Sequence, residues 1–213
     1  MKPSYGYPRK LGVLIAAVTP TNWMRVSLYR LLYGDGVSRS ARIGFGTVIA
    51  VDSARIGGAA IGRFNRFQGP LALEIADGAK MGDRNQVDCG EWILSDRPEG
   101  SRGSCTLGAN ALVTGNHYID VTSGFSLGAR SWIAGRETQV WTHGSGVPDG
   151  KVEIGSDSYV GSAARFAPGS GVGDCCVVGL GAVVTKKFSG TRQLIAGVPA
   201  VVVRENIDWP RTP

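Results

Sequence analysis

The sequence predicts an all-β chain wound as a solenoid of short strands, a hexapeptide-repeat β-helix. In residues 154–189 of this 213-residue chain the sequence pattern repeats every six residues, and each block of six opens with an apolar residue. A period of six fits neither an α-helix nor an alternating strand, but it suits short strands joined by sharp corners. The 32 glycines agree with this, since corners need residues that tolerate positive φ. The predicted inward residues are Ile154, Val160, Phe166, Val172, Val178 and Val184.

Residues 1–40 are predicted to form a helical segment. Pro20 separates the apolar run Leu11–Val18 from a second run of mixed apolar and basic residues, which indicates two short helices that end at the Gly-Asp-Gly of residues 34–36. One interpretation is a cap over the first coil, which a solenoid requires. The other is an amphipathic anchor that makes peripheral membrane contact through residues 1–36. The apolar run is about half of the ~20 residues that a spanning helix needs.

Residues 41–190 are predicted to form the β-helix itself. Pairs of an apolar residue followed by Gly also occur before the regular six-residue repeats, but their spacing is uneven. The extra residues between them must therefore leave the coils as loops. We expect insertions near 96–104 and 142–151, where polar residues and glycines gather. Insertions in solenoids collect on one face and often carry function. Residues 191–213 are predicted to be a terminal strand and a polar tail.

Composition restricts the partners. The formal net charge is +6 and the sequence pI about 9.4, which favours an acidic partner such as a coenzyme phosphate or an anionic membrane surface. Nucleic acid is not expected, because no run of five like charges occurs. The four cysteines have neither disulfide nor zinc spacing, which predicts reduced thiols in a cytoplasmic protein.

The two histidines of the chain, His117 and His143, both lie where the repeat is disturbed. Histidine is the side chain best able to take and return a proton near neutral pH, so each is a candidate general base. Either is also compatible with a hydrogen-bonded structural role. Asp120 or Glu137 is placed to orient an imidazole.

Aromatic and charged residues near His143 suggest where an acceptor binds. Trp132 and Trp141 flank it, and a sugar ring packs its C–H face on an exposed indole; the alternative is burial at a subunit interface. Arg136 and Glu137 are candidates to bind sugar hydroxyls or an acidic sugar.

Several segments together resemble one family. The Thr-His-Gly at 142–144 followed by a loop and KVEIGSDSYVGSAARFAPGSGVG, then VVGLGAVVTKKF and AGVPAVVVR, are similar to the hexapeptide-repeat acyltransferases. The galactoside, maltose and capsular-polysaccharide O-acetyltransferases are the most alike, and the resemblance covers about residues 41–204. It implies a left-handed parallel β-helix, a homotrimer, and acetyl-coenzyme A in a cleft between neighbouring subunits.

The resemblance also implies roles for residues. His143 matches the family's catalytic base, and Asp120 matches an acidic residue that binds the acceptor or orients that base. Asn116 and His117 are similar to a segment of other branches, so His117 is a second candidate base or, with Asn116, an acceptor-binding group. Positions matching the coenzyme contacts are Ser162, Leu180, Gly181, Thr185, Lys186 and Arg204.

One departure weakens the phosphate assignment of Arg204. The family often carries a basic residue three positions earlier, where this chain has Val201, and Lys187 is a candidate substitute. Backbone N–H groups near Gly144 or Gly161 are the candidates to stabilise an oxyanion.

The resulting functional prediction is an acetyl-CoA-dependent O-acetyltransferase acting on a sugar hydroxyl in surface polysaccharide or glycolipid assembly. We expect it in the cytoplasm, including the inner face of the membrane, and expect no metal. Alternatives are N-acetylation of an amino sugar, transfer of a longer acyl chain, and a non-catalytic structural protein. A zinc enzyme of the carbonic-anhydrase type is disfavoured, because it needs three histidines per site.

Overall fold

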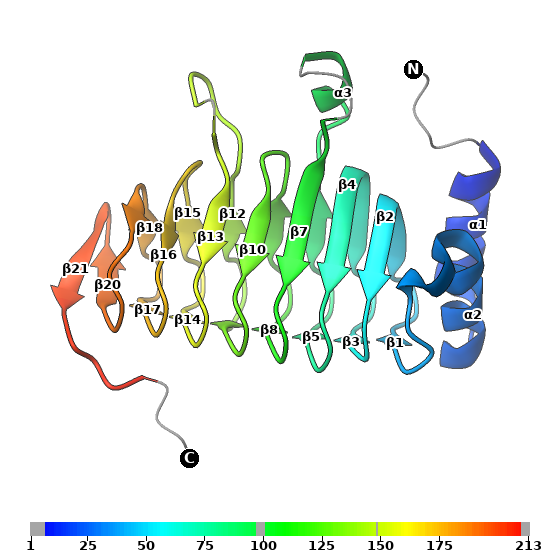
Figure 1. The fold of residues 1–213 in the computed structure, drawn as a ribbon, viewed down its shortest axis with the longest axis horizontal. Coiled ribbons are helices and arrows are strands. Elements are labelled where there is room, and N and C mark those ends of the chain that lie inside the picture. The colour runs from blue at the N-terminus through cyan, green and yellow to red at the C-terminus, as the bar shows by residue number, and fades with distance from the viewer. Residues whose placement is uncertain (1–6, 97–100, 148, 210–213) are drawn as a thin grey trace.

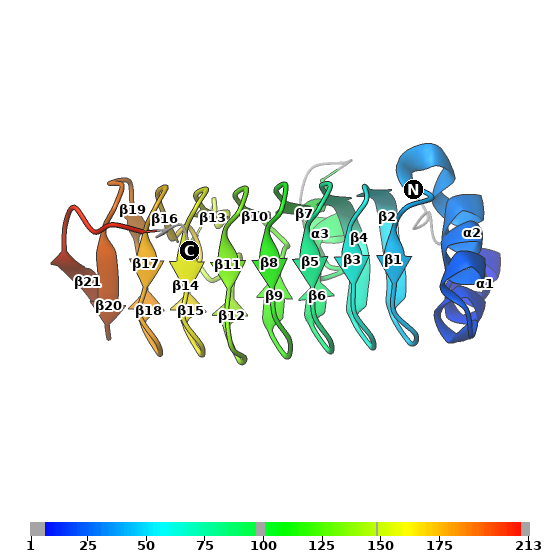
Figure 2. The same cartoon turned by 90° about the horizontal axis from the view of Figure 1, so that it is seen from below.

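A computed structural model describes residues 7–96, 101–147 and 149–209. The chain forms a prism of stacked parallel coils that is closed at one end by two helices (Figures 1 and 2). The all-β prediction is confirmed, and the fold matches a left-handed hexapeptide-repeat β-helix. Among the described residues, no helix is both long and apolar enough to cross a membrane.

The helical end consists of α1 (Tyr7–Val18), α2 (Asn22–Tyr33) and the 3₁₀ turn η1 (Gly34–Gly36). The first coil would otherwise leave a row of backbone groups without partners. Side chains of α2 supply those partners: the Asn22 amide binds Ile43 N–H at 2.8 Å, and Tyr29 Oη donates to the carbonyl of Thr47 at 2.7 Å. The cap therefore satisfies the open edge as well as covering the core.

Each coil contributes strands to three rows. The first row contains β1 (Arg42–Ile43), β3 (Ala60–Ile61), β5 (Lys80–Met81), β8 (Leu112–Val113), β11 (Trp132–Ile133), β14 (Tyr159–Val160), β17 (Val177–Val178) and β20 (Leu194–Gly197), and ends with antiparallel β21 (Ala200–Arg204). The second row contains the beginnings of β2 (Val48–Ile56) and β4 (Arg66–Ile75), then β6 (Gln86–Asp88), β9 (Tyr118–Asp120), β12 (Gln139–Val140), β15 (Arg165–Phe166) and β18 (Val183–Val184). The third row contains the ends of β2 and β4, then β7 (Gly103–Leu107), β10 (Phe125–Leu127), β13 (Val152–Ile154), β16 (Gly171–Val172) and β19 (Lys187–Phe188).

The core is the narrow interior of the prism. All six residues that the period of six predicted to point inward are buried, with no more than 4% of their surface exposed. They stack coil on coil through register pairs such as Val160 with Val178 and Phe166 with Val184. Burial of each such side chain stabilises the fold by roughly 1.5–3 kcal/mol relative to exposure.

Two insertions leave the prism along one edge, between the second and third rows (Figure 1). The first lies between β6 and β7 and contains the short helix α3 (Ile93–Asp96); the second lies between β12 and β13. The first departs earlier than the expected 96–104, and its end lies before Gly103 because Gly103 and Ser104 pair with β4. Residues 97–100 of the expected range lie outside the described residues.

Candidate active site

Asp120 and His143 meet at the edge from which the insertions leave. Asp120 is the last residue of β9, and β9 pairs directly with β12, which ends three residues before His143. His143 Nδ1 lies 2.8 Å from Asp120 Oδ2. The imidazole is 38% exposed, whereas the carboxylate is 3% exposed. A buried acid thus orients a partly exposed histidine.

The carboxylate of Asp120 is held by four hydrogen bonds besides that from His143. Thr122 donates its hydroxyl at 2.6 Å and its N–H at 3.3 Å, and Thr142 donates both its hydroxyl and its N–H at 2.7 Å. Burial alone would raise the pKa of Asp120, but the hydrogen bonds from Thr122, Thr142 and His143 hold it below its usual value. Because an ionised carboxylate is purely an acceptor, the proton of neutral His143 sits on Nδ1, and Nε2 has a free lone pair.

Trp92 covers the imidazole from the first insertion. Its ring centroid lies 5.4 Å from that of His143, at an interplanar angle of 60°. A Cβ at Gly90 would collide with the indole nitrogen, so glycine is needed for Trp92 to take this position. The two insertions therefore contact each other at the candidate base.

A second aromatic pair lies beside the site on the second row. Tyr118 projects from β9 and Trp141 follows β12, with ring centroids 4.9 Å apart and an interplanar angle of 42°. Trp141 is exposed and stands two residues before His143. This ring pair is a surface on which the apolar face of a ligand can pack.

His117 is not part of this arrangement. It is only 2% exposed, Nδ1 accepts the N–H of Thr138 at 3.1 Å, and Nε2 lies 3.0 Å from the Thr114 hydroxyl. Burial lowers the pKa of His117 to about 4, so it is neutral at physiological pH. A ring with both nitrogens bonded inside the prism is unsuited to proton transfer with a bound substrate.

His117 instead continues a polar ladder at the corner between the first and second rows. At each step a side-chain acceptor takes the backbone N–H of the residue one coil further on, at 2.8–3.2 Å. Every member is buried, so each acceptor satisfies a corner N–H that water does not reach. The ladder runs Thr47, Asn65, Asn85, His117 and Thr138.

The remaining acceptor candidates lie away from His143. Asn116 and Glu137 occupy corner positions with φ of 61° and 66°, and Arg136 is at the same corner, across the second row from the insertions. Trp132 is exposed on the first row, where it neighbours Tyr159. Within one subunit the structure does not bring these four residues to the Asp120–His143 pair.

The coenzyme candidates divide between two corners. Thr185 and Lys186 follow β18, at the corner that also carries His143, whereas Ser162, Leu180 and Gly181 lie at the opposite corner of the second row. Lys187 is engaged elsewhere, since its Nζ lies 2.6 Å from Glu153. The last candidate, Arg204, ends β21 beyond both corners.

The two oxyanion candidates also differ. The Gly161 N–H is already donated to the carbonyl of Val178 at 2.9 Å, which leaves Gly144, next to the base, as the candidate donor. Within residues 7–96, 101–147 and 149–209, no three His, Cys, Asp or Glu side chains gather in a geometry that would hold a metal ion.

The chain resembles a solved polysialic acid O-acetyltransferase, OatWY, with a TM-score of 0.59 and 23% sequence identity over 83% of this chain and 86% of that one. This likeness shows that the two chains share a fold. A second structure, the polySia-specific acetyltransferase NeuO, aligns with a TM-score of 0.49 and 20% identity over 82% of this chain and 84% of that one.

One curated sequence relative of this hexapeptide-repeat chain is a chloramphenicol acetyltransferase from Agrobacterium fabrum (strain C58 / ATCC 33970). It is 32% identical over 130 residues, which is 57% of this chain. The match spans 59% of that relative's own length. No family model matches the chain.

Proposed function

We propose that the protein is an acetyl-CoA-dependent O-acetyltransferase that acts on a sugar hydroxyl, with His143 as general base. The observation that carries the proposal is the Asp120–His143 hydrogen bond of 2.8 Å, with a buried carboxylate behind a partly exposed imidazole. Such a pair is built to take up and return one proton. The names of the related proteins, all acetyltransferases, support the same reaction class.

In the proposed reaction, Nε2 of His143 takes the proton of the acceptor hydroxyl as the oxygen attacks the thioester carbonyl. The tetrahedral adduct collapses with cleavage of the carbon–sulfur bond, and the departing sulfur takes the proton back from His143. Asp120 stabilises the imidazolium that exists between the two transfers, and because its own pKa is lowered it does not take the proton itself. The Gly144 N–H is the proposed donor to the oxyanion.

The aromatic side chains around His143 support a sugar as acceptor. Trp92 lies against the base and Trp141 stands two residues before it; both are exposed, and Tyr118 extends the surface of Trp141. Pyranose rings present flat C–H faces that pack on such surfaces, while their hydroxyls stay available to the base.

The coenzyme assignments support a homotrimer. Thr185 and Lys186 are at the corner of the base, but Ser162, Leu180 and Gly181 are at the opposite corner of the second row. One acetyl-CoA molecule contacts both groups when the corner of one subunit faces the corner of its neighbour. We therefore place the coenzyme in a cleft between subunits of a homotrimer.

The test measures release of the coenzyme A thiol from acetyl-CoA in the presence of a panel of neutral, amino and acidic sugars. We expect sugar-dependent release for the wild type and a loss of about 10²–10⁴-fold in kcat for His143→Ala. A product that hydroxylamine cleaves is an ester, whereas a resistant product would be the amide of an amino sugar. Full activity of a folded His143→Ala variant would overturn the assignment of the base.

A further inference from the structure

The helical end of the prism exposes an apolar surface that the fold leaves uncovered. In α1 the buried residues Val13, Ala16 and Ala17 face the rest of the protein. The opposite face carries large apolar side chains at positions i, i+3, i+4 and i+7, which form one stripe of a helix. These exposed residues are Leu11, Leu14, Ile15 and Val18.

The second helix extends this surface. Trp23, Met24 and Leu31 of α2 are also exposed, and Trp23 lies in the first turn of α2, after the three-residue connection from α1. Seven of the 18 large hydrophobic side chains that are exposed in the described residues fall within residues 11–31. Because α1 and α2 close the end of the prism, their outer faces point away from the coils (Figure 2).

The charge of the chain is concentrated at the same end. Residues 1–34 contain five Lys and Arg and no Asp or Glu, whereas residues 35–213 contain 18 basic and 17 acidic residues. Nearly all of the net charge of +6 therefore belongs to the helical segment. The five basic residues are Lys2, Arg9, Lys10, Arg25 and Arg30; Arg25 is buried against the Ile43 and Thr19 carbonyls, so it is not one of the cations of the outer surface.

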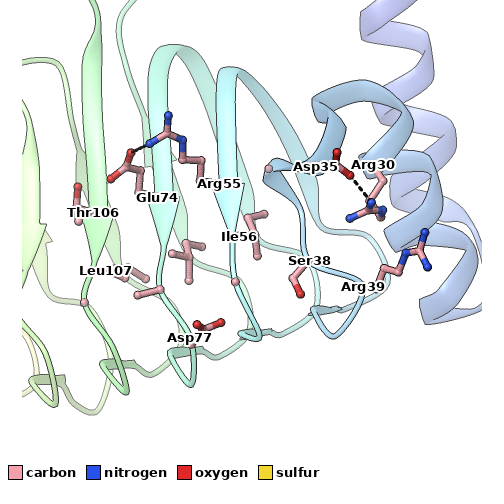
Figure 3. A pocket seen from close by; sticks show the side chains of 15 residues that line it. Arg30, Asp35, Ser38, Arg39, Arg55, Ile56, Glu74, Asp77, Thr106 and Leu107 are labelled. Atoms are coloured by element: carbon pink, nitrogen blue, oxygen red, sulfur yellow. Dashed lines mark hydrogen bonds and ion pairs between the residues drawn. The ribbon is translucent and has the colours of Figure 1, made fainter.

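A groove beside the helices contains Arg39, which adds one more positive charge to this end of the prism. Figure 3 shows Arg30, Arg39 and Arg55 lining this groove of about 820 Å³ between α2 and the third row. Arg30 pairs with Asp35, and Arg55 pairs with Glu74. Arg39 makes no ion pair within the described part of the chain, and together with Trp23 it also lines a hollow on α2.

We propose that this helical surface docks on an anionic phospholipid membrane. An amphipathic helix with an apolar stripe and basic flanks lies in the membrane interface, where its apolar face enters the acyl boundary and its cations contact lipid phosphates. At 12 residues α1 is about 18 Å long, too short for the ~30 Å hydrocarbon core, so the contact is peripheral. A protein partner is a weaker match, since residues 1–34 contain no Asp or Glu to form the mixed polar rim of a protein interface.

The proposal does not depend on the acetyl-transfer reaction, and its test uses the full chain and vesicles alone. Co-sedimentation with vesicles of equal parts phosphatidylcholine and phosphatidylglycerol should exceed that with phosphatidylcholine vesicles and should fall as salt rises. Leu14→Glu and Ile15→Glu should each weaken binding on the order of tenfold, because each removes buried apolar area. Both positions are exposed and glutamate favours helices, so the variants should fold.

Val203→Glu is the matched control, because Val203 is equally apolar and exposed but lies on β21 at the other end of the prism. It should bind vesicles as the wild type does. Leu14→Gln separates the loss of apolar area from the added charge and should also weaken binding. The proposal is overturned if the wild type does not prefer anionic vesicles, or if the α1 variants bind as well as Val203→Glu. It is equally overturned if these variants instead reduce the oligomer mass, which would mean that a second copy covers α1.

Discussion

Asp120 Oδ2 accepts the Nδ1–H of His143 across a single step between adjacent coils, at 2.8 Å. Asp120→Asn should lower kcat by about 10²–10⁴-fold, because an amide neither fixes this tautomer nor stabilises the imidazolium. KM for the acceptor should change little. Steady-state kinetics on the purified variants measure both values.

Asp88→Asn is the control for Asp120→Asn. Asp88 occupies the same register position one coil earlier, but its carboxylate pairs with Arg66 at 2.8 Å. Its replacement should change kcat by less than about threefold, since exposed ion pairs contribute about 0–1 kcal/mol. Equal losses in the two variants would argue against a specific role for Asp120.

His117 should be needed for stability rather than for proton transfer. His117→Ala leaves the buried Thr138 N–H without its acceptor and should lower the free energy of unfolding by about 2 kcal/mol. His117→Asn restores an acceptor of the kind that Asn65 and Asn85 supply in the same ladder, and should recover much of that loss. Denaturant unfolding measures the stability, and both folded variants should retain kcat within a few-fold. A loss of kcat as large as that of His143→Ala would contradict this.

Acid should destabilise the fold partly through His117. The pKa of His117 is about 4 in the folded chain, compared with its usual value of 6.5. The contribution of neutral His117 to the free energy of unfolding is therefore full above pH 6.5 and decreases as the pH falls below it. Between pH 6.5 and about 4 the unfolded chain takes up a proton that the folded chain does not, which costs at most about 1.4 kcal/mol per pH unit. Unfolding free energies of His117→Asn should fall less steeply over this window, whereas identical pH profiles would refute the assignment.

Trp92 should support the base from the first insertion. Trp92→Ala removes the ring that lies against His143, and we expect kcat/KM to fall on the order of tenfold, as for the loss of a partly desolvated cation–π contact. Trp92→Phe should recover part of the activity. Leu94→Ala is the control, because Leu94 is exposed in the same insertion, and it should retain full activity. If Leu94→Ala lost as much, the insertion would act through its folding instead.

Lys186 and Lys187 should differ in coenzyme binding. Lys187 is bound to Glu153, whose pKa is lowered to about 2 by hydrogen bonds from Lys151 and Lys187, whereas no ion pair of Lys186 occurs among the described residues. Lys186→Ala should raise KM for acetyl-CoA several-fold, and Lys187→Ala should leave it nearly unchanged. If instead Lys187→Ala raised KM for acetyl-CoA and Lys186→Ala did not, the phosphate contact would be assigned to Lys187 on the third row.

The regular coils were predictable because their side chains repeat at a fixed interval. The six predicted inward residues, at every sixth position from Ile154 to Val184, are all buried as expected. The two-residue strands β14, β15, β17 and β18 each bury one side chain, so periodicity alone identifies it. The long upstream strands β2 and β4, which turn a corner without a break, have no such signal.

The candidate site was predictable in part. The proximity of Asp120 and His143 follows from the family resemblance, but Trp92 lies in an irregular loop, where no period fixes the direction of a side chain. The structural role of His117 did have a sequence signal. Thr47, Asn65, Asn85, His117 and Thr138 each stand two residues before an inward apolar residue. That recurrence indicates a column of hydrogen-bond acceptors at this corner. The role of His117 becomes visible only when it is compared with the equivalent positions of the other coils.

Because β9 stacks directly on β12, the distance between the acid and the base does not depend on the number of coils in the prism. The acid and the base are one coil apart, and that distance is set by the ~4.8 Å spacing of neighbouring strands. A whole coil gained or lost near β3, towards the helical end, would leave the distance unchanged. A single residue added between Asp120 and Val140 would instead turn His143 away from its partner. The length of the prism, and so the distance between its two ends, can therefore change during evolution without altering the geometry of the Asp120–His143 pair.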